Sequence, residues 1–509
     1  MSVTESTPSA AHGASESGKL HRRALGVPDL VFFIVAASAP LTAVAGGQAA
    51  TYLVTGNKGV PFMFIPLGIV LALFAVGYAA MSRHVANAGA FYAYVARGLG
   101  KVQAVGAAFV ALIAYNSMQI GIYGLFGVAM GAFMSDKLGI DIAWWGWCLI
   151  GGGVIGLLGV LQIDLNARVL AVLLCLEVLV VAIFDFAILA DPGPEGLTTV
   201  GFHPNVAFGS AVGATLTFCV ASFVGFESAA IYSEEVRDPK RTVARATFIA
   251  VGLIAVFYAL SGWLVGVAAG PSTIVDPGAL GAAGFGSPDA PDPTTVLFIT
   301  GADRLGAFWG DAASLLFATS LFAALLSFHN AVSRYGFALG REGVLPRVFG
   351  RVNDRTGAPF VASITQTVLA LAVVVVFALA GADPVLKLFT WLTNLGALGV
   401  LLLMAMTSFA VVAYFRRDPH PDVSAWASRW APAIAGVALL VVLVLGVLNF
   451  NVLITSATDA PTDKMTVILP VILFGGGLVG LLVGAVLKSR RPAIYARIGE
   501  GPEAEAAAA

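Results

Sequence analysis

The chain has little charge and few cysteines. Charged residues make up 11% of its 509 residues, whereas soluble domains contain about 25%. The three cysteines, Cys148, Cys175 and Cys219, all lie in apolar runs and form no CxxC pair, which argues against a disulfide framework and a cysteine metal site. The net charge of -1 says nothing about binding partners, but the lack of a basic stripe argues against a nucleic-acid-binding protein.

Hydrophobic residues, in contrast, make up 58% of the chain. Apolar runs of 18 or more residues recur along it, and each is long enough to cross roughly 30 Å of hydrocarbon. We therefore expect an all-α polytopic membrane protein with twelve transmembrane helices. The predicted spans are 27–52, 60–81, 104–133, 143–162, 168–190, 209–232, 246–269, 310–333, 360–380, 387–413, 432–450 and 466–488.

The polar segments are expected outside the bilayer. Residues 1–20 are rich in Ser, Ala and Glu, without an apolar core, and predict a disordered N-terminal tail instead of a signal peptide. Residues 489–509 are expected to form a C-terminal tail. The connection 270–304 contains several turn formers and no helical period, so we expect it to be irregular and outside the membrane.

The distribution of basic residues predicts the orientation. If the N-terminus is cytoplasmic, all but five of the 28 Lys and Arg residues fall in the inside segments. The five on the outside are Lys58, Lys137, Arg304, Lys387 and Lys464. Because basic residues concentrate in cytoplasmic loops, we expect a multi-pass protein of the cytoplasmic membrane with both termini inside, in agreement with an even number of spans.

Two spans contain residues that weaken a helix. Span 1 carries Ala36-Ala37-Ser38-Ala39-Pro40, and proline removes a helical hydrogen bond. Span 6 carries the patch Ser222–Glu227, with Gly225 and a carboxylate. Interrupted helices five spans apart are typical of inverted five-plus-five repeats, in which a ligand binds between the two breaks.

Each break has a functional and a structural interpretation. In span 1, amides after Pro40 would bind a carboxylate and carbonyls before it an ammonium group; alternatively the helix is only kinked, with its small residues packed on a neighbour. In span 6, Gly225 and Glu227 lie among Phe218, Phe223 and Phe226, as in an apolar pocket. Glu227 would brace the break or hold a proton. Alternatively, it is a neutral carboxylic acid that is hydrogen-bonded to a backbone group.

Other polar residues lie inside the predicted spans. Glu177 is near the centre of span 5, where burial favours the neutral acid and a carboxyl group is suited to carry a proton; a purely structural neutral acid is the alternative. Asp185 is interpreted as a surface or vestibule residue. Tyr115 and Asn116 indicate a cavity wall or interhelical hydrogen bonding. His329 is expected at the cytoplasmic membrane edge, at a structural interface; a pH sensor is the alternative.

Three segments carry a family resemblance. FVGFESAAIYSEEVRDPKRTVARA in span 6, ANAGAFYAYVARGLG (86–100) and NAVSRYGFALGREGVLPRVFGRVNDRTGAP (330–359) resemble motifs of the amino acid–polyamine–organocation (APC) superfamily, in the same order. The resemblance implies a LeuT-type fold of ten core helices in two inverted repeats plus two peripheral helices. The repeats would be residues 22–190 and 209–413, and the peripheral helices would lie within 432–488.

The resemblance also implies roles for individual residues. The substrate's carboxylate would meet backbone around Ala37, Ser38 and Ala39, and its ammonium would meet carbonyls around Ala221, Ser222 and Val224. Several members of the family carry a lysine in span 5 at the position of Glu177, and some have an aromatic residue at the position of Ala221. The predicted substrate-binding residues are Ala37, Ser38, Ala39, Pro40, Asn116, Ala221, Ser222, Phe223, Val224, Gly225 and Phe226, and the predicted proton-coupling residues are Glu177 and Glu227.

The first functional hypothesis is therefore a secondary active transporter, coupled to protons, that moves an amino acid by alternating access. The alternative is a permease or exchanger for an amine such as putrescine, ethanolamine or γ-aminobutyrate, for which Glu177 and Glu227 would supply paired carboxylates. The sequence predicts no enzyme, because the spans hold no nucleophile–base pair, and no cofactor. It leaves the substrate, the coupling ion and the oligomeric state open.

Overall fold

The computed structural model describes residues 26–85, 91–161, 163–209, 211–227, 236, 239–353, 355–457 and 460–500. The predicted tail 1–20 lies outside these residues. So do residues 86–90, 228–235, 237–238 and 354, which belong to the three family motifs, and the last residues, 501–509.

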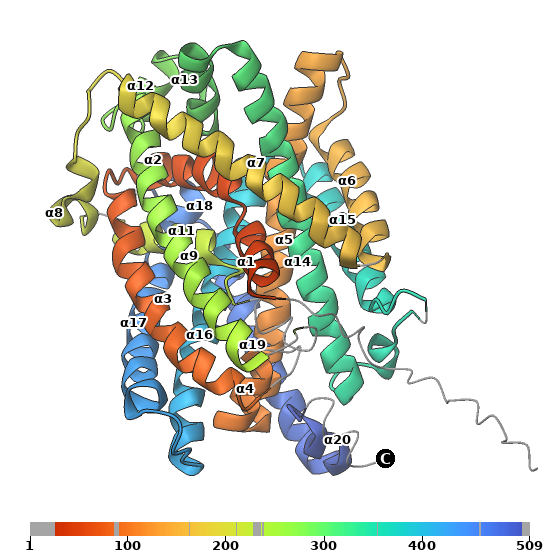
Figure 1. Ribbon diagram of the computed structural model, residues 1–509. Helices are drawn as coiled ribbons and strands as arrows, with labels where there is room; N and C mark the ends of the chain where they lie inside the picture. Colours follow the sequence, from red (N-terminus) through yellow and green to blue (C-terminus); the bar gives the residue numbers. More distant parts are fainter. Residues whose placement is uncertain are drawn as a thin grey trace, which may run out of the picture.

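The described residues are almost entirely helical (Figure 1). They include nine helices that are long and apolar enough to cross a membrane. These are α3 (Val60–Ser82), α5 (Lys101–Leu138), α7 (Ile163–Ala190), α11 (Pro239–Ala269), α14 (Ala307–Glu342), α15 (Phe360–Leu379), α16 (Thr390–Arg417), α17 (Ala431–Leu448) and α19 (Met465–Arg490). Helices are expected here because hydrocarbon offers backbone amides and carbonyls no water to bind. Two shorter apolar helices are α6 (Trp144–Val160) and α9 (Val212–Phe223).

The segment predicted as span 1 is an interrupted helix. It begins as α1 (Val27–Ser38), breaks at Ala39, and continues from Pro40 through the π-helix η1 (Thr42–Gln48) into α2 (Ala49–Thr55). Ala39 has a φ of 44°, a conformation that alanine rarely adopts. Pro40 lacks an amide hydrogen and starts the second helical part, the position at which proline is best tolerated.

The helix in the segment predicted as span 6 ends before the predicted span does. Helix α9 ends at Phe223, and residues 224–227 form a turn. Gly225 has a φ of 113°, which strongly favours glycine because a Cβ would clash with the backbone. Both helix breaks therefore occur at the residues that the sequence indicated.

The long helix α5 lies at the centre of the bundle. It packs against α14, α16 and α19, while α3 packs against α11 and α17. Helix α7 crosses the bundle obliquely in Figure 1. Large apolar side chains are exposed on the outer helices, among them Val376 on α15, Leu448 on α17 and Leu482 on α19. Such surfaces are expected where a helix faces lipid.

Short elements connect the long helices. They are α4 (Phe91–Gly98), η2 (Val200–Phe202), α8 (Pro204–Ala207), α12 (Pro277–Ala282), the antiparallel pair β1 (Gly286–Ser287) and β2 (Ala290–Pro291), η4 (Pro293–Thr295), α13 (Val296–Leu305), η5 (Arg347–Gly350), η6 (Pro384–Phe389), η7 (Trp426–Trp430), α18 (Phe450–Thr455) and α20 (Pro492–Arg497).

Two expectations about these regions are wrong. The connection 270–304 was predicted to be irregular, but its end forms α13, whose Val296 and Leu297 are buried in the core. The span predicted to end at residue 333 continues as α14 to Glu342, because Tyr335, Phe337 and Leu339 are all buried and extend its packed face.

Candidate substrate site

A small cavity lies between the two helix breaks. It encloses about 50 Å³, room for only a few water molecules, since one water needs roughly 10–15 Å³ by this measure. Its walls come from both interrupted segments and from α5, α14 and the junction of η6 with α16. The lining residues are Ser38, Ala39, Thr42, Ala43, Gly47, Met118, Ile122, Phe218, Ala221, Ser222, Ala324, Phe328, Phe389 and Thr393.

Four of the predicted substrate-binding residues line this cavity: Ser38 and Ala39 at the first break, and Ala221 and Ser222 in the last turn of α9. The side chain of Ala37 is outside the described residues. Six others are not among the lining residues: Pro40, Asn116, Phe223, Val224, Gly225 and Phe226. Asn116 instead donates its side-chain amide to the Leu112 carbonyl of its own helix, at 2.7 Å.

A chain of hydroxyl groups leads from the cavity to Glu177. Thr42 Oγ1, on the cavity wall, lies 3.0 Å from Ser320 Oγ. Ser320 Oγ in turn donates a hydrogen bond to Glu177 Oε2 at 2.6 Å. All three side chains are buried. Glu177 therefore lies behind the cavity wall, and two hydroxyls connect it to the cavity.

The first break is also fastened to α11. Tyr258 donates its hydroxyl to the Ser38 carbonyl at 2.9 Å, and lies 3.1 Å from Ser38 Oγ. The Thr42 amide, in the first turn after the break, lies 3.4 Å from Ser320 Oγ. Polar groups freed by the interrupted helix are thus paired with side chains of α11 and α14, as buried backbone groups require.

Glu227 closes the second break. Its Oε2 accepts a hydrogen bond from the Gly225 amide at 3.0 Å, and its Oε1 accepts one from the Tyr115 hydroxyl at 2.6 Å. The Glu227 carbonyl accepts a third, from the Tyr78 hydroxyl, at 2.8 Å. Glu227 thus ties the unwound turn to α5 and α3, in keeping with the interpretation of a brace.

One sequence interpretation is wrong. Asp185 was assigned to the surface or a vestibule, but its side chain is buried and accepts a hydrogen bond from Ser261 Oγ at 2.6 Å. His329, which was expected at a structural interface, is fully buried, and its Nε2 lies 2.8 Å from Ser363 Oγ on α15. That contact does join two helices, as a structural interface would.

Several lining residues were missed by sequence reasoning. Met118 and Ile122 follow the polar turn of α5. The prediction of a cavity wall was based on the polar residues of that turn and did not include these two apolar residues. Thr42 had a usable signal, because it is the first hydroxyl after Pro40, in the first turn of the restarted helix. Phe389 and Thr393 contribute from the start of α16, and no local pattern of the sequence marks them.

Comparison with known proteins agrees with this architecture. The profile of the family described as "Amino acid permease" matches residues 25–476. A cadaverine/lysine antiporter of Escherichia coli K12 is 33% identical over 155 residues, which is 30% of this chain and 30% of the antiporter. The chain is thus aligned with less than a third of that relative's length. A vacuolar cationic amino acid transporter 2 of Arabidopsis thaliana is 26% identical over 81% of this chain and 62% of its own.

Solved structures show the same fold. The chain superposes on a manganese transporter of Eremococcus coleocola with a TM-score of 0.54 and 18% sequence identity, over 94% of this chain and 99% of that one. A mutant of the same transporter gives a TM-score of 0.53 at 19% identity, over 92% of this chain and 94% of the mutant. The predicted LeuT-like transporter fold is therefore confirmed, and the chain is a multi-pass membrane protein that belongs to the amino acid permease family of the APC superfamily.

Proposed function

We propose that the chain is a secondary active transporter that moves an amino acid across the cytoplasmic membrane by alternating access, coupled to protons. The observation that carries this proposal is the cavity bounded by both helix breaks, whose lining contains hydroxyls and apolar groups but no charged side chain among the described residues. Such a wall suits a ligand that is neutral overall and has its charges bound by backbone dipoles.

The two breaks present opposite helix ends to the cavity. The helical segment that restarts at Pro40 has its N-terminal end at the cavity, with the Thr42 amide paired with Ser320 Oγ, and the last turn of α9 ends at the cavity around Ala221 and Ser222, with the Ala221 carbonyl paired with the Val224 amide. N-terminal ends attract anions and C-terminal ends attract cations. A zwitterion with its carboxylate toward Ser38 and Thr42 and its ammonium toward Ser222 satisfies both ends. The cavity is small, so larger substrates require it to widen in another state of the cycle.

Glu177 is the proposed proton carrier. Ser320 donates to its carboxyl group, and Thr42 continues that contact to the cavity wall. A substrate that binds at Thr42 would disturb the same hydroxyl chain, which gives a physical route from occupancy of the cavity to the protonation of Glu177. The coupling role proposed from sequence for Glu227 receives less support, since its two donors, Tyr115 and the Gly225 amide, are not among the lining residues of the cavity.

The proposed topology has twelve spans in a five-plus-five inverted repeat with two peripheral helices. The nine long helices, the two short ones and the interrupted first segment together account for this number. The two breaks would then occupy matching places in the two repeats, 22–190 and 209–413, with the peripheral helices in 432–488.

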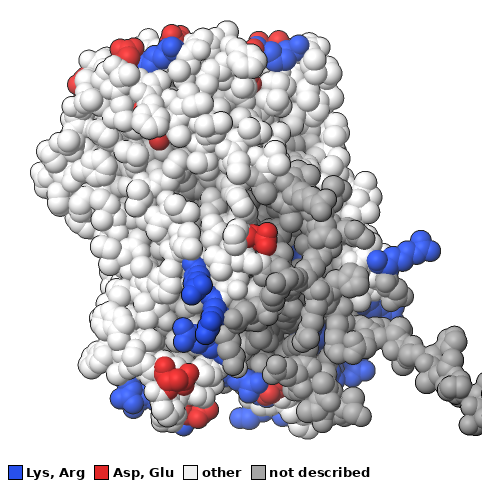
Figure 2. Space-filling model, viewed as in Figure 1, with Lys and Arg blue, Asp and Glu red and all other residues white. Residues whose placement is uncertain are grey.

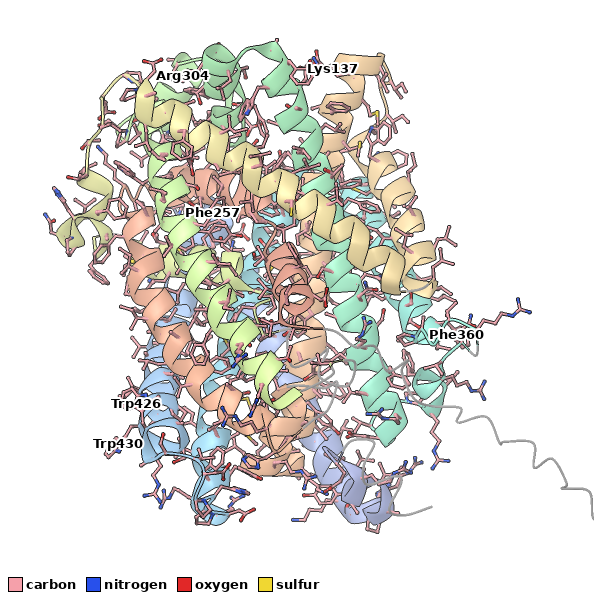
Figure 3. The ribbon with its side chains drawn as sticks, in the orientation of Figure 1. Lys137, Phe257, Arg304, Phe360, Trp426 and Trp430 are labelled. Carbon is pink, nitrogen blue, oxygen red and sulfur yellow. The ribbon has the colours of Figure 1, made fainter. Side chains whose placement is uncertain are left out.

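We further propose that both termini are cytoplasmic. In Figure 3, Lys137 and Arg304, which the distribution of basic residues assigns to the outside, lie at one end of the molecule, and Trp426 and Trp430 lie near the other. Lys and Arg gather mainly toward that other end in Figure 2, beyond a broad uncharged band. Both tryptophans are exposed, as expected of residues at a membrane interface.

A transporter of amines is the second candidate. Two relatives from Escherichia coli favour it. One is the cadaverine/lysine antiporter, and the other is a low-affinity putrescine importer, which is 29% identical to this chain over 28% of this chain and 28% of its own. A dicationic amine needs anionic groups in the cavity. Neither Glu177 nor Glu227 is among the lining residues, so the geometry favours the amino acid.

Counterflow in proteoliposomes separates the two candidates. Vesicles are preloaded in parallel with single amino acids or amines, and one labelled tracer pool is offered to all of them. We expect accumulation with amino acids that carry both an α-carboxylate and an α-ammonium group. Accumulation only with amines that lack a carboxylate would reject the amino acid in favour of the second candidate.

A further inference from the structure

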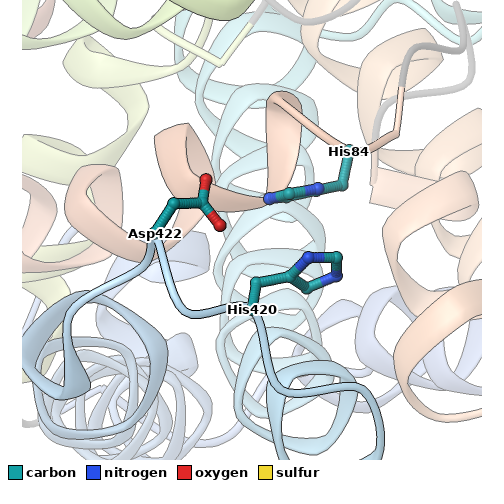
Figure 4. A group of neighbouring side chains, drawn as sticks. All are labelled: His84, His420 and Asp422. Atoms are coloured by element: carbon teal, nitrogen blue, oxygen red, sulfur yellow. The ribbon is translucent and has the colours of Figure 1, made fainter.

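A cluster of metal-binding side chains lies away from the substrate cavity. His84 follows the end of α3, and His420 and Asp422 lie in the loop between α16 and η7 (Figure 4). One nitrogen of each histidine and one carboxylate oxygen of Asp422 all lie within 4.8 Å of one another. None of the three residues lines the cavity, so the cluster is separate from the transport site.

Aromatic rings enclose one side of this cluster. The imidazoles of His84 and His420 have centroids 4.1 Å apart and are tilted by 33°. Tyr414 stacks on His420 at 5.9 Å, and Phe415 meets both imidazoles edge-on at 5.8 and 5.9 Å. On the other side Asp422 is exposed, so the cluster has a supporting wall and an open approach from solvent.

The polar contacts of His420 are long. Its Nε2 lies 3.4 Å from Asp418 Oδ2 and 3.4 Å from the Tyr414 hydroxyl, both beyond the usual range of a hydrogen bond. Arg417, on the same segment, donates to the Gly98 carbonyl at 2.8 Å. Asp418 and Asp422 both lie beside His420. Two carboxylates next to an imidazole favour the binding of a cation.

We propose that His84, His420 and Asp422 form a binding site for a zinc ion that links the end of α3 to the loop after α16. Two imidazole nitrogens and a carboxylate oxygen are a ligand set that zinc accepts, with a fourth position left to water. Tetrahedral zinc separates its ligand atoms by roughly 3.3 Å, so the three side chains need to close by about 1.5 Å or less. Loop residues 418–422 can supply this movement through side-chain rotation.

The ligand set also discriminates among divalent cations. Magnesium and calcium prefer oxygen ligands in larger numbers, and the cluster offers two nitrogens and one carboxylate. Zinc is therefore expected to bind, whereas magnesium is not. Asp418, close to His420, is placed to orient that ring as a carboxylate beside a metal-bound imidazole does.

The test uses the purified full-length protein after removal of any histidine tag. Zinc chloride is titrated by calorimetry, and zinc retained after gel filtration is measured by mass spectrometry. The wild type is expected to retain about one zinc ion per chain. Three variants are expected to bind zinc about tenfold more weakly or worse: His84→Gln, His420→Gln and Asp422→Asn. His203→Gln is the matched control, because His203 is exposed and lies outside the cluster.

Thermal unfolding supplies a second readout that does not depend on retention. Zinc that binds only the folded protein raises its melting temperature, so the wild type and His203→Gln should show a rise with zinc and none with magnesium. The three cluster variants should show a smaller rise than the wild type at the same zinc concentration, while having melting temperatures without zinc close to that of the wild type. Equal zinc binding by the wild type and by a His84→Gln/His420→Gln double variant, or an equal rise in melting temperature, would overturn the proposal.

Discussion

The two helix breaks each have a buried carboxyl group nearby, but the two carboxyl groups are held differently. Glu227 belongs to its break: it binds the Gly225 amide two residues before it and the Tyr115 hydroxyl, and its carbonyl binds Tyr78. Glu177 belongs to another helix. Its carboxyl group accepts hydrogen bonds from the Leu41 amide, just after the first break, and from Ser320, which is linked through Thr42 to the cavity.

This difference distinguishes a carboxyl group with a structural role from one that is suited to bind and release a proton during the transport cycle. Each carboxyl group has two donors, and a donor left unpaired in a buried site costs free energy. The donors of Glu227 do not line the cavity, whereas Ser320, a donor to Glu177, leads through Thr42 to the cavity wall. A group that faces a short hydroxyl chain can change its protonation when that chain is disturbed. We therefore expect substitutions at the second break to impair folding or binding and substitutions around Glu177 to impair coupling.

The largest effect is expected for Gly225→Leu. A leucine at a φ of 113° is strained and should displace the turn that shapes the second break. We expect counterflow to fall to background while the protein still inserts, as measured by its yield and elution profile in detergent. Gly153→Leu on α6 is the control, because its added side chain meets open space; normal counterflow by Gly225→Leu would show that the break does not shape the site.

The next effect is expected for Glu227→Ala. It leaves the Tyr115 hydroxyl and the Gly225 amide without their carboxylate partner, at a cost of roughly 1–3 kcal/mol. We expect a lower melting temperature in detergent and a parallel loss of counterflow and gradient-driven uptake. Tyr115→Phe should show a smaller decrease of the same kind. A stable Glu227→Ala protein that loses only gradient-driven uptake would reverse the roles of the two carboxyl groups.

A selective effect is expected for Ser320→Ala. This change breaks the hydroxyl chain between Thr42 and Glu177 and leaves the cavity wall itself in place, since Ser320 is not a lining residue. We expect gradient-driven uptake to fall about tenfold, equivalent to about 1.4 kcal/mol, with counterflow reduced less. Thr319→Ala is the matched control, because Thr319 binds the Leu316 carbonyl of its own helix; equal losses in both variants would argue against the chain.

The smallest effect is expected for Ala39→Gly. Ala39 has a φ of 44°, so glycine relieves strain that offsets its larger entropy in the unfolded chain. The melting temperature should stay within a few degrees of the wild type or rise. Ala182→Gly, in the interior of α7, should lower stability by about 1 kcal/mol. A larger decrease for Ala39→Gly than for Ala182→Gly would mean that the alanine methyl group at the break is needed for packing.

The helix breaks could be predicted because their causes are local. Pro40 and Gly225 act on their own backbone, and Glu177 is conspicuous as a carboxylate in an apolar run. What joins these residues is not local: the Thr42–Ser320–Glu177 chain connects three segments, and the Tyr115–Glu227 bond connects α5 to the second break. No spacing in the sequence encodes these pairings, which depend on how the helices pack.

The errors have the same origin. Asp185 was assigned to the surface from its place near a span end, but Ser261 on α11 binds it inside the bundle. Asn116 was assigned to the cavity from its polarity, but it bonds within its own helix, and the neighbouring Met118 and Ile122 line the cavity instead. Polarity within a span marks a residue that needs a partner; it does not say whether that partner is a substrate.

Uptake by Glu177→Gln, measured beside Glu227→Gln, tests the central claim most directly. Both proteins are reconstituted in vesicles. Uptake of the substrate identified by counterflow is measured first under exchange and then with a proton gradient directed into the vesicles. We predict that Glu177→Gln retains counterflow activity but loses uptake driven by the proton gradient. In Glu227→Gln, counterflow and gradient-driven uptake should fall by the same factor. Gradient-driven uptake by Glu177→Gln equal to that of the wild type, with unchanged pH dependence, would contradict the role of Glu177 as the proton carrier.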